Sequence, residues 1–298
     1  MNILELVNKF PTQESCIKHL EQVRWNDKPK CVYCGSENTN PLVAELRHHC
    51  NGCRKSFSVT VGTIFHNSHV ELQKWFLVMS LMLNARKGLS AYQISRDLGM
   101  RRPTVWSMMH RIRKAMATNQ AELLSGVVEM DETYIGGKPR RRNKDKDDND
   151  NFPTIKRGRG TDKECVIGMI ERGGKVKTQH HSKKDGKKLS FKALRDIVVK
   201  NVDMFSTTLM TDDFKGYKPF KGIIPHHTVN HSRKEYVNGI AHTNTIESFW
   251  AIFKRGIKGQ FHWVSPKYLS RYLDEFCWRF NHKDNEFMFE KLLTNSVR

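Results

Sequence analysis

Four cysteines in two close pairs constrain the fold of this chain more than any other feature of its sequence. Cys31 and Cys34 are separated by two residues, and Cys50 and Cys53 repeat this spacing after an interval of fifteen residues. Four thiolates so arranged can form a complete tetrahedral shell around one structural Zn²⁺ ion, and the metal then stands in for a hydrophobic core. Residues 29–66 are therefore predicted to be a zinc ribbon, which is usually a module that binds DNA, RNA or protein.

Two histidines, His48 and His49, precede the second cysteine pair. Either could replace a zinc ligand, but a complete set of four cysteines leaves no vacancy. Four buried free cysteines are the other interpretation, and the repeated paired spacing argues against it. The seven cysteines of the chain fit a metal site in a reducing compartment, because four lie in close pairs and three are isolated.

The charge of the chain points to a polyanionic partner. The 298 residues include 51 Lys and Arg against 31 Asp and Glu, which gives a formal net charge of +20. Such a field attracts nucleic acid, and an anionic membrane surface is the competing partner. No apolar run approaches the roughly 20 residues of a spanning helix, and no secretory signal is visible. We therefore expect no membrane partner and a cytoplasmic, DNA-associated protein.

Helical patterns flank the predicted ribbon. Residues 1–28 are predicted to form a short helical lead-in, and residues 67–120 contain a stretch that resembles a helix-turn-helix. A first helix over residues 91–98 would lead to a turn at Gly99. Pro103 would open the second helix, where its missing N–H costs nothing.

The two faces of this helix pair differ in character. The apolar positions predicted to pack inward are Ile94, Leu98, Val105, Met109 and Ile112. A recognition helix in the major groove needs a polar outer face. The positions predicted to face outward and bind DNA are Arg101, Arg102, Thr104, Ser107, His110 and Arg111. An ordinary helical hairpin with solvated arginines is the minority interpretation.

From residue 126 the hydrophobic period changes to that of strands. Three consecutive strands are predicted at residues 126–137, 164–174 and 175–183. A helix, two strands and two helices follow, at residues 189–202, 207–213, 223–232, from about 244, and 266–282. This order predicts an α/β domain over residues 126–298. The polar insertion 138–162 has almost nothing to bury, and is expected to be a mobile loop that contacts DNA or is merely soluble.

Three acids on separate predicted elements form a candidate metal site. They are Asp131 in the first strand, Asp212 or Asp213 at the end of a later strand, and Glu247 near the start of a helix. Metal-assisted phosphodiester chemistry uses two divalent cations, and Mg²⁺ needs only one or two carboxylates per ion. We therefore predict two Mg²⁺ or Mn²⁺ ions at these residues.

Each acid also has a simpler interpretation. Asp131 could pair with an arginine, although an acid within an apolar strand is costly to bury. At least one of Asp212 and Asp213 could form the turn that follows the strand. Asn244 and Glu247 match an N-x-x-E capping box, which would assign the glutamate to the helix N-terminus.

The helix that begins near Glu247 adds two cations. Its predicted buried stripe consists of Ile246, Phe249, Trp250, Phe253 and Ile257. Lys254 and Lys258 lie with Glu247 on a flanking face, and are predicted to contact DNA. A cation at Lys254 could bind the phosphate next to the one under attack.

Together these residues resemble an insertion-sequence transposase of the DDE type. The similarity is to the bacterial family that joins a zinc ribbon and a helix-turn-helix to a catalytic domain, relatives of the eukaryotic Merlin elements. It spans nearly the whole chain, in the ordered motifs "CVYC", "GTIF", "MDETYIGGK", "TDDFKGY", "HTNTIESFWAIFKRGI" and "YLDEFCWRFN". The resemblance implies an α/β multidomain fold in which an RNase H-like catalytic domain, with a mixed sheet flanked by helices, follows the ribbon and the helical region.

The resemblance also implies roles for residues. Matched motif by motif, Asp131, Asp212 and Glu247 are the catalytic, metal-binding acids, and Lys254 is their companion. The implied activity is Mg²⁺-dependent cleavage at the terminal inverted repeats of an insertion sequence and strand transfer into target DNA. Because two ends must be brought together, a homo-oligomer is expected.

Three carboxylates, Glu129, Asp131 and Glu132, crowd into one apolar strand. Strand alternation places Glu129 and Asp131 on one face and Glu132 on the other. The pattern alone does not choose between Asp131 and Glu132 as the metal ligand, and the resemblance points to Asp131. Glu132 is then the acid without an assigned role, and is expected to pair with a nearby basic side chain.

Two other functions compete with transposition. One is a non-catalytic, zinc-dependent DNA-binding regulator derived from a transposase, which the presence of all three acids and Lys254 disfavours. The other is an RNase H-like structure-specific nuclease without a joining step. The ribbon and the helix-turn-helix argue against the nuclease, because together they favour sequence-specific binding of DNA ends.

Overall fold

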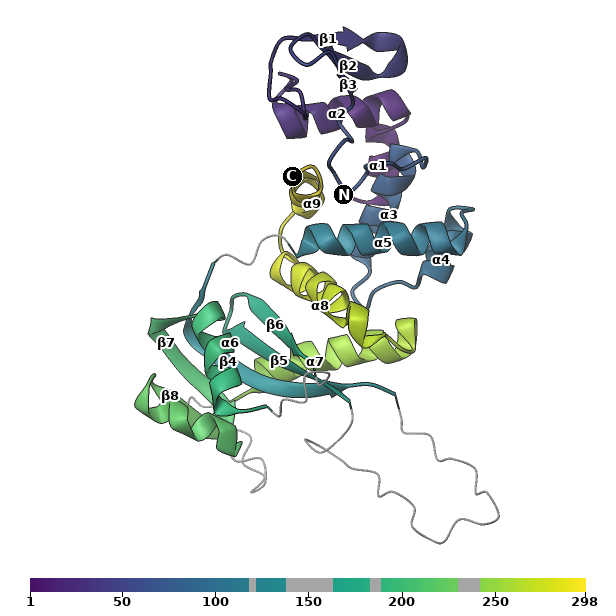
Figure 1. Ribbon diagram of the computed structural model, residues 1–298. Helices are drawn as coiled ribbons and strands as arrows, with labels where there is room; N and C mark the ends of the chain where they lie inside the picture. Colours follow the sequence, from purple (N-terminus) through teal and green to yellow (C-terminus); the bar gives the residue numbers. More distant parts are fainter. Residues whose placement is uncertain (118–121, 138–162, 183–188, 230–241) are drawn as a thin grey trace, which may run out of the picture. The chain divides into compact units, whose positions relative to one another are not determined.

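The chain folds into two compact units (Figure 1). In the computed structural model the first unit comprises Met1–Asn119 together with His282–Arg298, and the second comprises Gln120–Asn281. The residues that the structure describes are 1–117, 122–137, 163–182, 189–229 and 242–298. The basic insertion 138–162, for which a loop was predicted, lies outside them.

The predicted ribbon is a small antiparallel sheet with the strand order β1-β2-β3. Its strands are β1 (Thr39–Leu42), β2 (Arg47–Cys50) and β3 (Ser56–Phe57), and a 3-10 turn, η1 (Val43–Glu45), joins the first two. The buried cluster beside the sheet consists of Cys31, Cys50 and Phe57, and Trp25, Val32 and Cys53 pack against it partly buried. A sheet with so little apolar surface to bury needs another source of stability, as a metal site would provide.

Helices build the rest of the first unit. The predicted lead-in forms two helices, α1 (Ile3–Lys9) and α2 (Gln13–Trp25), which are interrupted at Pro11. Both begin with a capping box, in which the N-cap side chain accepts a hydrogen bond from the N3 backbone N–H and the N3 side chain accepts one from the N-cap backbone N–H. After the ribbon, α3 (Leu72–Asn84) supplies much of the apolar core, including the fully buried Phe76.

The predicted helix-turn-helix is present as two consecutive helices, α4 (Ala91–Asp97) and α5 (Arg102–Met116). Ser90 caps α4 by accepting a hydrogen bond of 3.1 Å from the N–H of Gln93. Gly99 in the turn has φ of +60°, a left-handed conformation that favours glycine. Pro103 lies in the first turn of α5, as the sequence predicted.

The last helix, α9 (Met288–Ser296), belongs to the first unit, so the second unit ends earlier than the predicted boundary at residue 298. Phe289 packs against Phe10 and Phe76, with ring centroids 6.5 and 5.8 Å apart. The apolar stripe of a helix predicts that it packs, but does not identify its partner. The boundary was therefore not readable from local patterns.

The second unit is built on a mixed five-stranded sheet with the order β6-β5-β4-β7-β8. The central strand β4 (Leu124–Ile135) pairs antiparallel with β5 (Glu164–Glu171) and parallel with β7 (Val202–Asp212). The edge strands are β6 (Val176–His181) and β8 (His226–Val229). This mixed α/β architecture confirms the expected fold class, and places the two strands that carry Asp131 and Asp212 next to each other.

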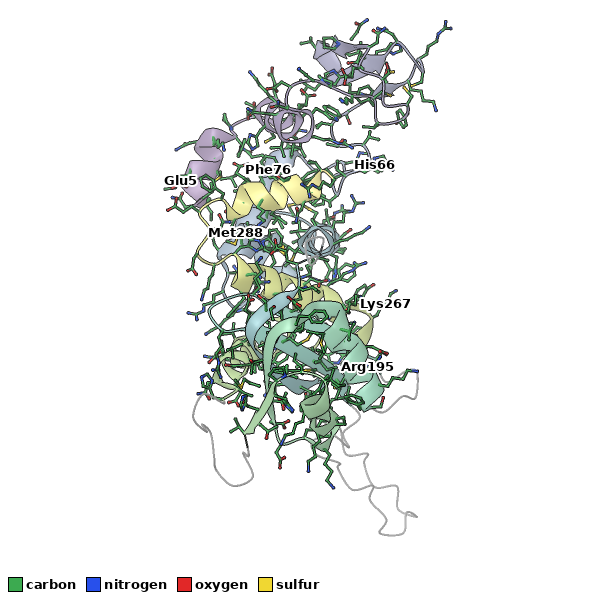
Figure 2. All side chains as sticks on the ribbon, turned by 90° about the vertical axis from the view of Figure 1, so that its left-hand side faces the viewer. Glu5, His66, Phe76, Arg195, Lys267 and Met288 are labelled. Atoms are coloured by element: carbon green, nitrogen blue, oxygen red, sulfur yellow. The ribbon has the colours of Figure 1, made fainter. Side chains whose placement is uncertain are left out.

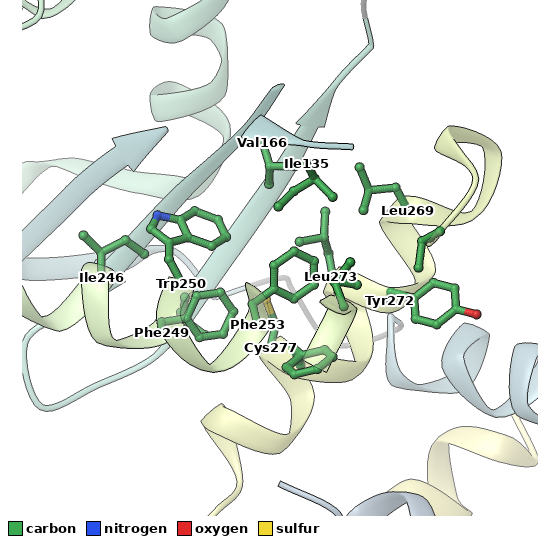
Figure 3. Packing of buried hydrophobic residues seen from close by; sticks show 14 of the residues in the cluster. Ile135, Val166, Ile246, Phe249, Trp250, Phe253, Leu269, Tyr272, Leu273 and Cys277 are labelled. Carbon is green, nitrogen blue, oxygen red and sulfur yellow. The ribbon is translucent and has the colours of Figure 1, made fainter. Parts of the chain in front are cut away.

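Helices cover both faces of this sheet. One face packs against α6 (Phe191–Asn201) and the 3-10 segment η4 (Lys215–Gly222). The other packs against α7 (Asn244–Gly256) and α8 (Pro266–Asn281), which a π-helical turn, η6 (Ile257–Phe261), connects. The cluster beneath α7 and α8 (Figure 3) includes Ile135, Val166, Ile246, Phe249, Trp250, Phe253, Leu273 and Cys277. Residues of β4 therefore alternate between the α7 face and the α6 face.

Charged side chains lie on the surface of both units (Figure 2). In the second unit, Arg195 of α6 and Lys267 of α8 are exposed. Among the residues that the structure describes, no helix has the length and apolar character needed to cross a membrane.

Candidate functional site

The four cysteines of the ribbon converge on one point. All four Sγ atoms lie within 4.8 Å of one another. Cys31 Sγ is 3.6 Å from Cys53 Sγ, and Cys34 Sγ is 3.5 Å from Cys50 Sγ. Zinc–sulfur bonds of about 2.3 Å in a tetrahedron place sulfur atoms about 3.8 Å apart, so the arrangement fits one Zn²⁺ ion.

The two histidines beside the cysteines have other partners. His48 Nε2 lies 2.7 Å from a carboxylate oxygen of Glu21, and His49 Nδ1 lies 3.3 Å from the hydroxyl of Ser56. Neither residue belongs to the group of close sulfur atoms. The candidate zinc site therefore consists of the four cysteines.

The predicted DNA-facing side of α5 is only partly as expected. His110 is 3% exposed, so the prediction that it faces outward is wrong. Its ring centroid lies 4.2 Å from that of Trp106, which is 39% exposed. The buried face of α5 is wider than the stripe chosen from the sequence, because it also includes Met108 and Arg113. Exposed or partly exposed side chains are retained by Arg101, Arg102, Thr104 and Ser107.

Arg111 of α5 is also engaged within the first unit. Its Nη1 donates hydrogen bonds to the carbonyl oxygens of Ile64 (3.0 Å) and His66 (2.8 Å). These bonds attach α5 to the segment that contains the "GTIF" motif. A DNA contact by Arg111 remains a prediction, but the side chain has a structural role that the sequence did not reveal.

Strand pairing brings Asp131 and Asp212 together. In the parallel pair of β4 and β7, Met130 is opposite Thr211, and the two aspartates follow directly. Neighbouring residues of paired strands direct their side chains to the same face of a sheet. Asp213 follows the end of β7 and is exposed. The geometry therefore groups Asp212 with Asp131.

Asp212 also makes the turn contact that was considered as its alternative role. Its Oδ1 accepts a hydrogen bond of 3.1 Å from the N–H of Phe214. A carboxylate has two oxygens with several acceptor positions, so this bond is compatible with a metal ligand at the same residue.

Glu247 lies in the first turn of α7, on the face of the sheet that Asp131 also occupies. The N-cap residue is Thr243, and Asn244 is the first helical residue, so the capping box built on Asn244 is not formed. The hydroxyl of Thr243 donates a hydrogen bond of 2.9 Å to Oε1 of Glu247. This bond orients the Glu247 carboxylate, a role for Thr243 that sequence patterns did not indicate.

Neighbouring acids act electrostatically on Asp131. Burial, together with the charges of Glu132, Asp212 and Glu247, raises the pKa of Asp131 to about 7. A carboxyl group surrounded by other acids is stabilised in its charged form by a nearby cation. Carboxylate oxygens are also the ligands that Mg²⁺ and Mn²⁺ prefer. The donor set therefore fits divalent metal ions.

A lysine lies within reach of the same acids. Burial lowers the pKa of Lys254, the charges of Asp131 and Glu247 oppose this shift, and Lys258 reinforces it. Lys254 is therefore near enough to Asp131 and Glu247 for their charges to act on its ammonium group. Lys258 lies one turn farther along, in η6, and is exposed.

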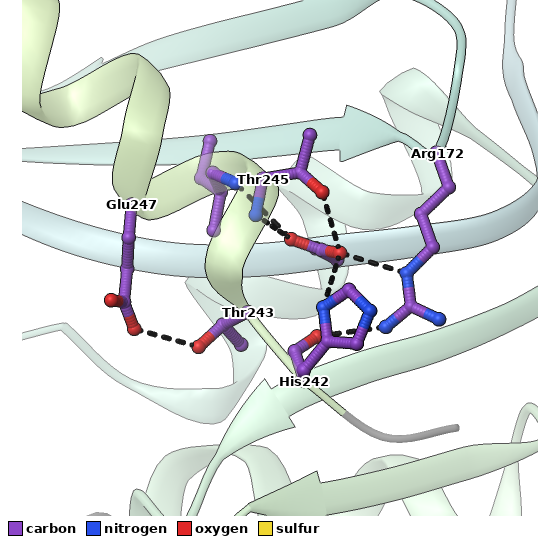
Figure 4. A network of polar contacts seen from close by, with 7 residues as sticks. Arg172, His242, Thr243, Thr245 and Glu247 are labelled. Atoms are coloured by element: carbon purple, nitrogen blue, oxygen red, sulfur yellow. Dashed lines mark hydrogen bonds and ion pairs between the residues drawn. The ribbon is translucent and has the colours of Figure 1, made fainter. Parts of the chain in front are cut away.

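The remaining acids of β4 have partners that the sequence did not predict. Glu132 accepts a hydrogen bond of 2.6 Å from the hydroxyl of Tyr217, and its pairing with a basic side chain remains a prediction. Burial and the charge of Glu132 raise the pKa of Tyr217, which keeps the phenol protonated as a donor. Glu129 is fully buried and bonds to the start of α7 and to Arg172 (Figure 4).

Two family models match the chain. One, described as an ISXO2-like transposase domain, matches residues 123–281, and the other, described as a transposase zinc-ribbon domain, matches residues 11–56. The first match covers more than half of the chain and ends at the same residue as the second compact unit. It includes the three acids, and the second match includes the four cysteines.

One protein and two solved structures are similar to this chain to different degrees. A protein of Halobacterium salinarum, described as an uncharacterized protein in transposable element ISH50, is 28% identical over 268 residues, which is 87% of this chain and 86% of its own length. The solved structures of a Mos1 strand transfer complex and of a pre-cleavage Mos1 transpososome share 11% identity with this chain. The match covers 74% of this chain and 78% of theirs, with TM-scores of 0.29 and 0.27. Scores this low mark only a distant likeness.

Proposed function

Because the chain belongs to the family of ISXO2-like transposases, we propose that it cleaves the terminal inverted repeats of an insertion sequence and transfers the freed strand into target DNA. The observation that carries this proposal is the association of Asp131, Asp212 and Glu247, which come from β4, β7 and α7. Their proximity is reflected in the pKa of Asp131, which burial and neighbouring acids raise to about 7. Three carboxylates in a chain of net charge +20 suit a site where cations meet nucleic acid.

Each side chain at the site has a distinct task in this mechanism. Asp131, Asp212 and Glu247 would hold two Mg²⁺ or Mn²⁺ ions, which when bound activate the attacking oxygen and stabilise the leaving oxygen. Lys254 offers its ammonium group to the neighbouring phosphate, and thereby holds the DNA strand in register. Cleavage and joining are both in-line phosphoryl transfers, so one arrangement of side chains serves both steps.

The first unit would supply recognition of the DNA ends. Arg101, Arg102, Thr104 and Ser107 give α5 a polar outer side suited to base edges and phosphates. One Zn²⁺ ion in the four-cysteine site would hold the ribbon in the shape needed to contact the terminal repeat. Lys258 and the general basic charge add phosphate affinity that weakens as salt increases. A homo-oligomer would bring two transposon ends together.

Strand transfer on oligonucleotides that carry the terminal repeats tests the proposal directly. With Mg²⁺ or Mn²⁺, the full-length protein should nick these ends and join them to target DNA. Asp131→Asn, Asp212→Asn and Glu247→Gln should each abolish both steps while leaving end binding intact. Asp213→Asn is the matched control, because it removes the same charge from the adjacent exposed position and should remain active.

Each alternative predicts a different result in this assay. Nicking without joining would indicate a structure-specific nuclease, and end binding without nicking would indicate a DNA-binding regulator. An active Asp212→Asn variant together with an inactive Asp213→Asn variant would show that the second acid is assigned to the wrong residue.

A further inference from the structure

Glu129 is a fully buried acid that has no task in the chemistry proposed above. It lies on β4 two residues before Asp131, and strand alternation directs both side chains to the face covered by α7. Burial of a carboxylate is costly unless hydrogen bonds and opposite charges compensate it. The partners of Glu129 therefore indicate what its burial achieves.

The carboxylate of Glu129 caps the N-terminus of α7. Its Oε2 accepts hydrogen bonds from the backbone N–H groups of Thr245 (2.8 Å) and Ile246 (3.1 Å). Its Oε1 accepts a bond of 2.9 Å from the hydroxyl of Thr245. The first amides of a helix lack partners within the helix, and a negative charge there is favourable. Glu129 thus supplies from β4 a cap that the side chain of the N-cap residue Thr243 does not provide.

The segment before α7 is held from a second side as well (Figure 4). Arg172 donates from Nε to Oε1 of Glu129 at 2.8 Å, and from Nη2 to the carbonyl oxygen of His242 at 3.0 Å. His242 Nδ1 also lies 3.1 Å from Oε1 of Glu129. The guanidinium compensates the buried negative charge and fixes the chain just before the helix starts.

The capped segment carries Glu247. This residue directly follows Ile246, and its carboxylate accepts the hydrogen bond from Thr243 at 2.9 Å. One side chain on β4 therefore connects the strand of Asp131 to the helix turn of Glu247. We infer that Glu129 is a positioning residue that, with Thr243 as its helper, sets the spacing between Asp131 and Glu247 for metal binding. This inference rests on the proposed function.

Packing fixes α7 at an independent point. Gly168 of β5 is the cross-strand neighbour of Asp131, and α7 lies directly over it. A Cβ atom at Gly168 would be 2.9 Å from Cδ1 of Ile246, and closer still to the ring of Trp250. The helix is thus bonded by Glu129 at its first turn and seated on Gly168 one turn later. Two such points define its position relative to the strand of Asp131.

Mn²⁺ binding measured by calorimetry tests the inference without requiring DNA cleavage. In Glu129→Ala, the dissociation constant for Mn²⁺ should rise roughly 10- to 100-fold, as for other residues that orient metal ligands. Glu129→Gln keeps one acceptor oxygen but loses the charge, so a smaller rise is expected. Thr243→Val should also weaken Mn²⁺ binding, because it removes only the hydroxyl that orients Glu247.

A matched control separates positioning from general stability. Glu275 is another fully buried glutamate of the second unit, and it pairs with Arg279 within α8. Glu275→Gln should lower the melting temperature about as much as Glu129→Gln and leave the Mn²⁺ affinity unchanged. Hydrogen exchange gives a second readout, since the amides of Thr245 and Ile246 should exchange faster in Glu129→Ala and at the wild-type rate in Glu275→Gln.

The outcomes distinguish the inference from the function on which it rests. Equal Mn²⁺ affinities in wild type and Glu129→Ala, or equal losses in Glu129→Gln and Glu275→Gln, would overturn the positioning role. A wild-type protein that binds Mn²⁺ but neither nicks nor joins DNA would overturn only the proposed function.

Discussion

The four-cysteine cluster and the acidic site are built in opposite ways. The cysteines come from two short turns that repeat one spacing, and each turn presents two sulfur atoms to the same point. The acids come from β4, β7 and α7, which strand pairing and helix packing must first bring together. The first site is therefore a local structure that a metal can complete, while the second depends on the fold around it. This difference makes Glu129 and Gly168 important for the acids, with no counterpart needed at the ribbon.

Removing zinc should have the largest effect, and should be confined to the first unit. A structural Zn²⁺ ion contributes on the order of 10 kcal/mol to the folding of a small ribbon. Cys50→Ser or a strong chelator should therefore unfold β1, β2 and β3, seen as loss of bound zinc and fast amide exchange over residues 39–57. His49→Ala is the control, and should retain zinc because His49 bonds Ser56. Faster exchange in β4 and β7 after zinc loss would break the comparison, since the acids would then depend on the ribbon.

Gly168→Val tests the acidic site, because it displaces the helix that carries Glu247 without substituting any of the three acids. The added side chain would collide with Ile246 and Trp250, and overpacking of this kind costs about 1–3 kcal/mol. The free energy of unfolding should fall by this amount in a denaturant titration, and strand cleavage should fall with it. Gly222→Ala is the control, because a Cβ there meets nothing within 4 Å. Full activity in Gly168→Val would mean that the site tolerates movement of α7.

Local features were predictable from the sequence because their causes lie within a few residues. The two cysteine turns, the turn at Gly99 and the strand that holds Asp131 are each determined by residues close together in the sequence. Asp212 was chosen over Asp213 by family resemblance, and the register of β4 and β7 gives the same grouping on independent grounds.

Long-range partners were not predictable for the opposite reason. Glu129 appears in the sequence as one more acid in an apolar strand, and only the fold brings the amides of α7 to it. His110 was expected to face outward because helical period alone does not tell how wide the buried face of α5 is. Similarly, one partner of Glu132 is a phenol that lies 85 residues away in the sequence.

Arg111 is an exception to this difference between the two units, because it makes a long-range polar contact within the first unit. Arg111→Met removes the donors to the carbonyl oxygens of Ile64 and His66, which should cost about 1–2 kcal/mol of unfolding free energy. Arg102→Met is matched on the same helix, and should change stability by less than about 0.5 kcal/mol because the side chain is exposed. For binding to the terminal repeat the larger effect should be that of Arg102→Met, with weaker affinity and a shallower salt dependence. Weaker DNA binding by Arg111→Met at unchanged stability would show that its main role is DNA contact.

Glu290 provides the smallest expected effect, and the sharpest test of whether the first unit also depends on distant carboxylates. This residue of α9 accepts hydrogen bonds from His19 and Lys9, each at 2.8 Å. Burial raises the pKa of Glu290, but these two partners outweigh burial and hold the pKa at about 2, against an ordinary value of 4.5. A folded-state pKa below the unfolded one means that the bonds stabilise the fold above about pH 4.5, and that this contribution is lost as the pH falls toward 2.

The unfolding free energies of wild type and Glu290→Gln should therefore differ by about 1 kcal/mol at pH 6, and the difference should shrink toward zero between pH 4.5 and pH 2. Comparing the two proteins at each pH cancels the loss of zinc that acid also causes. Glu286→Gln is the control, because it removes the same charge from an exposed position just before α9. If the difference persists at pH 2, the carboxylate charge is not what ties α9 to α1 and α2. If it is absent at pH 6, apolar packing of Phe289 suffices, and the dependence on distant carboxylates is a property of the second unit.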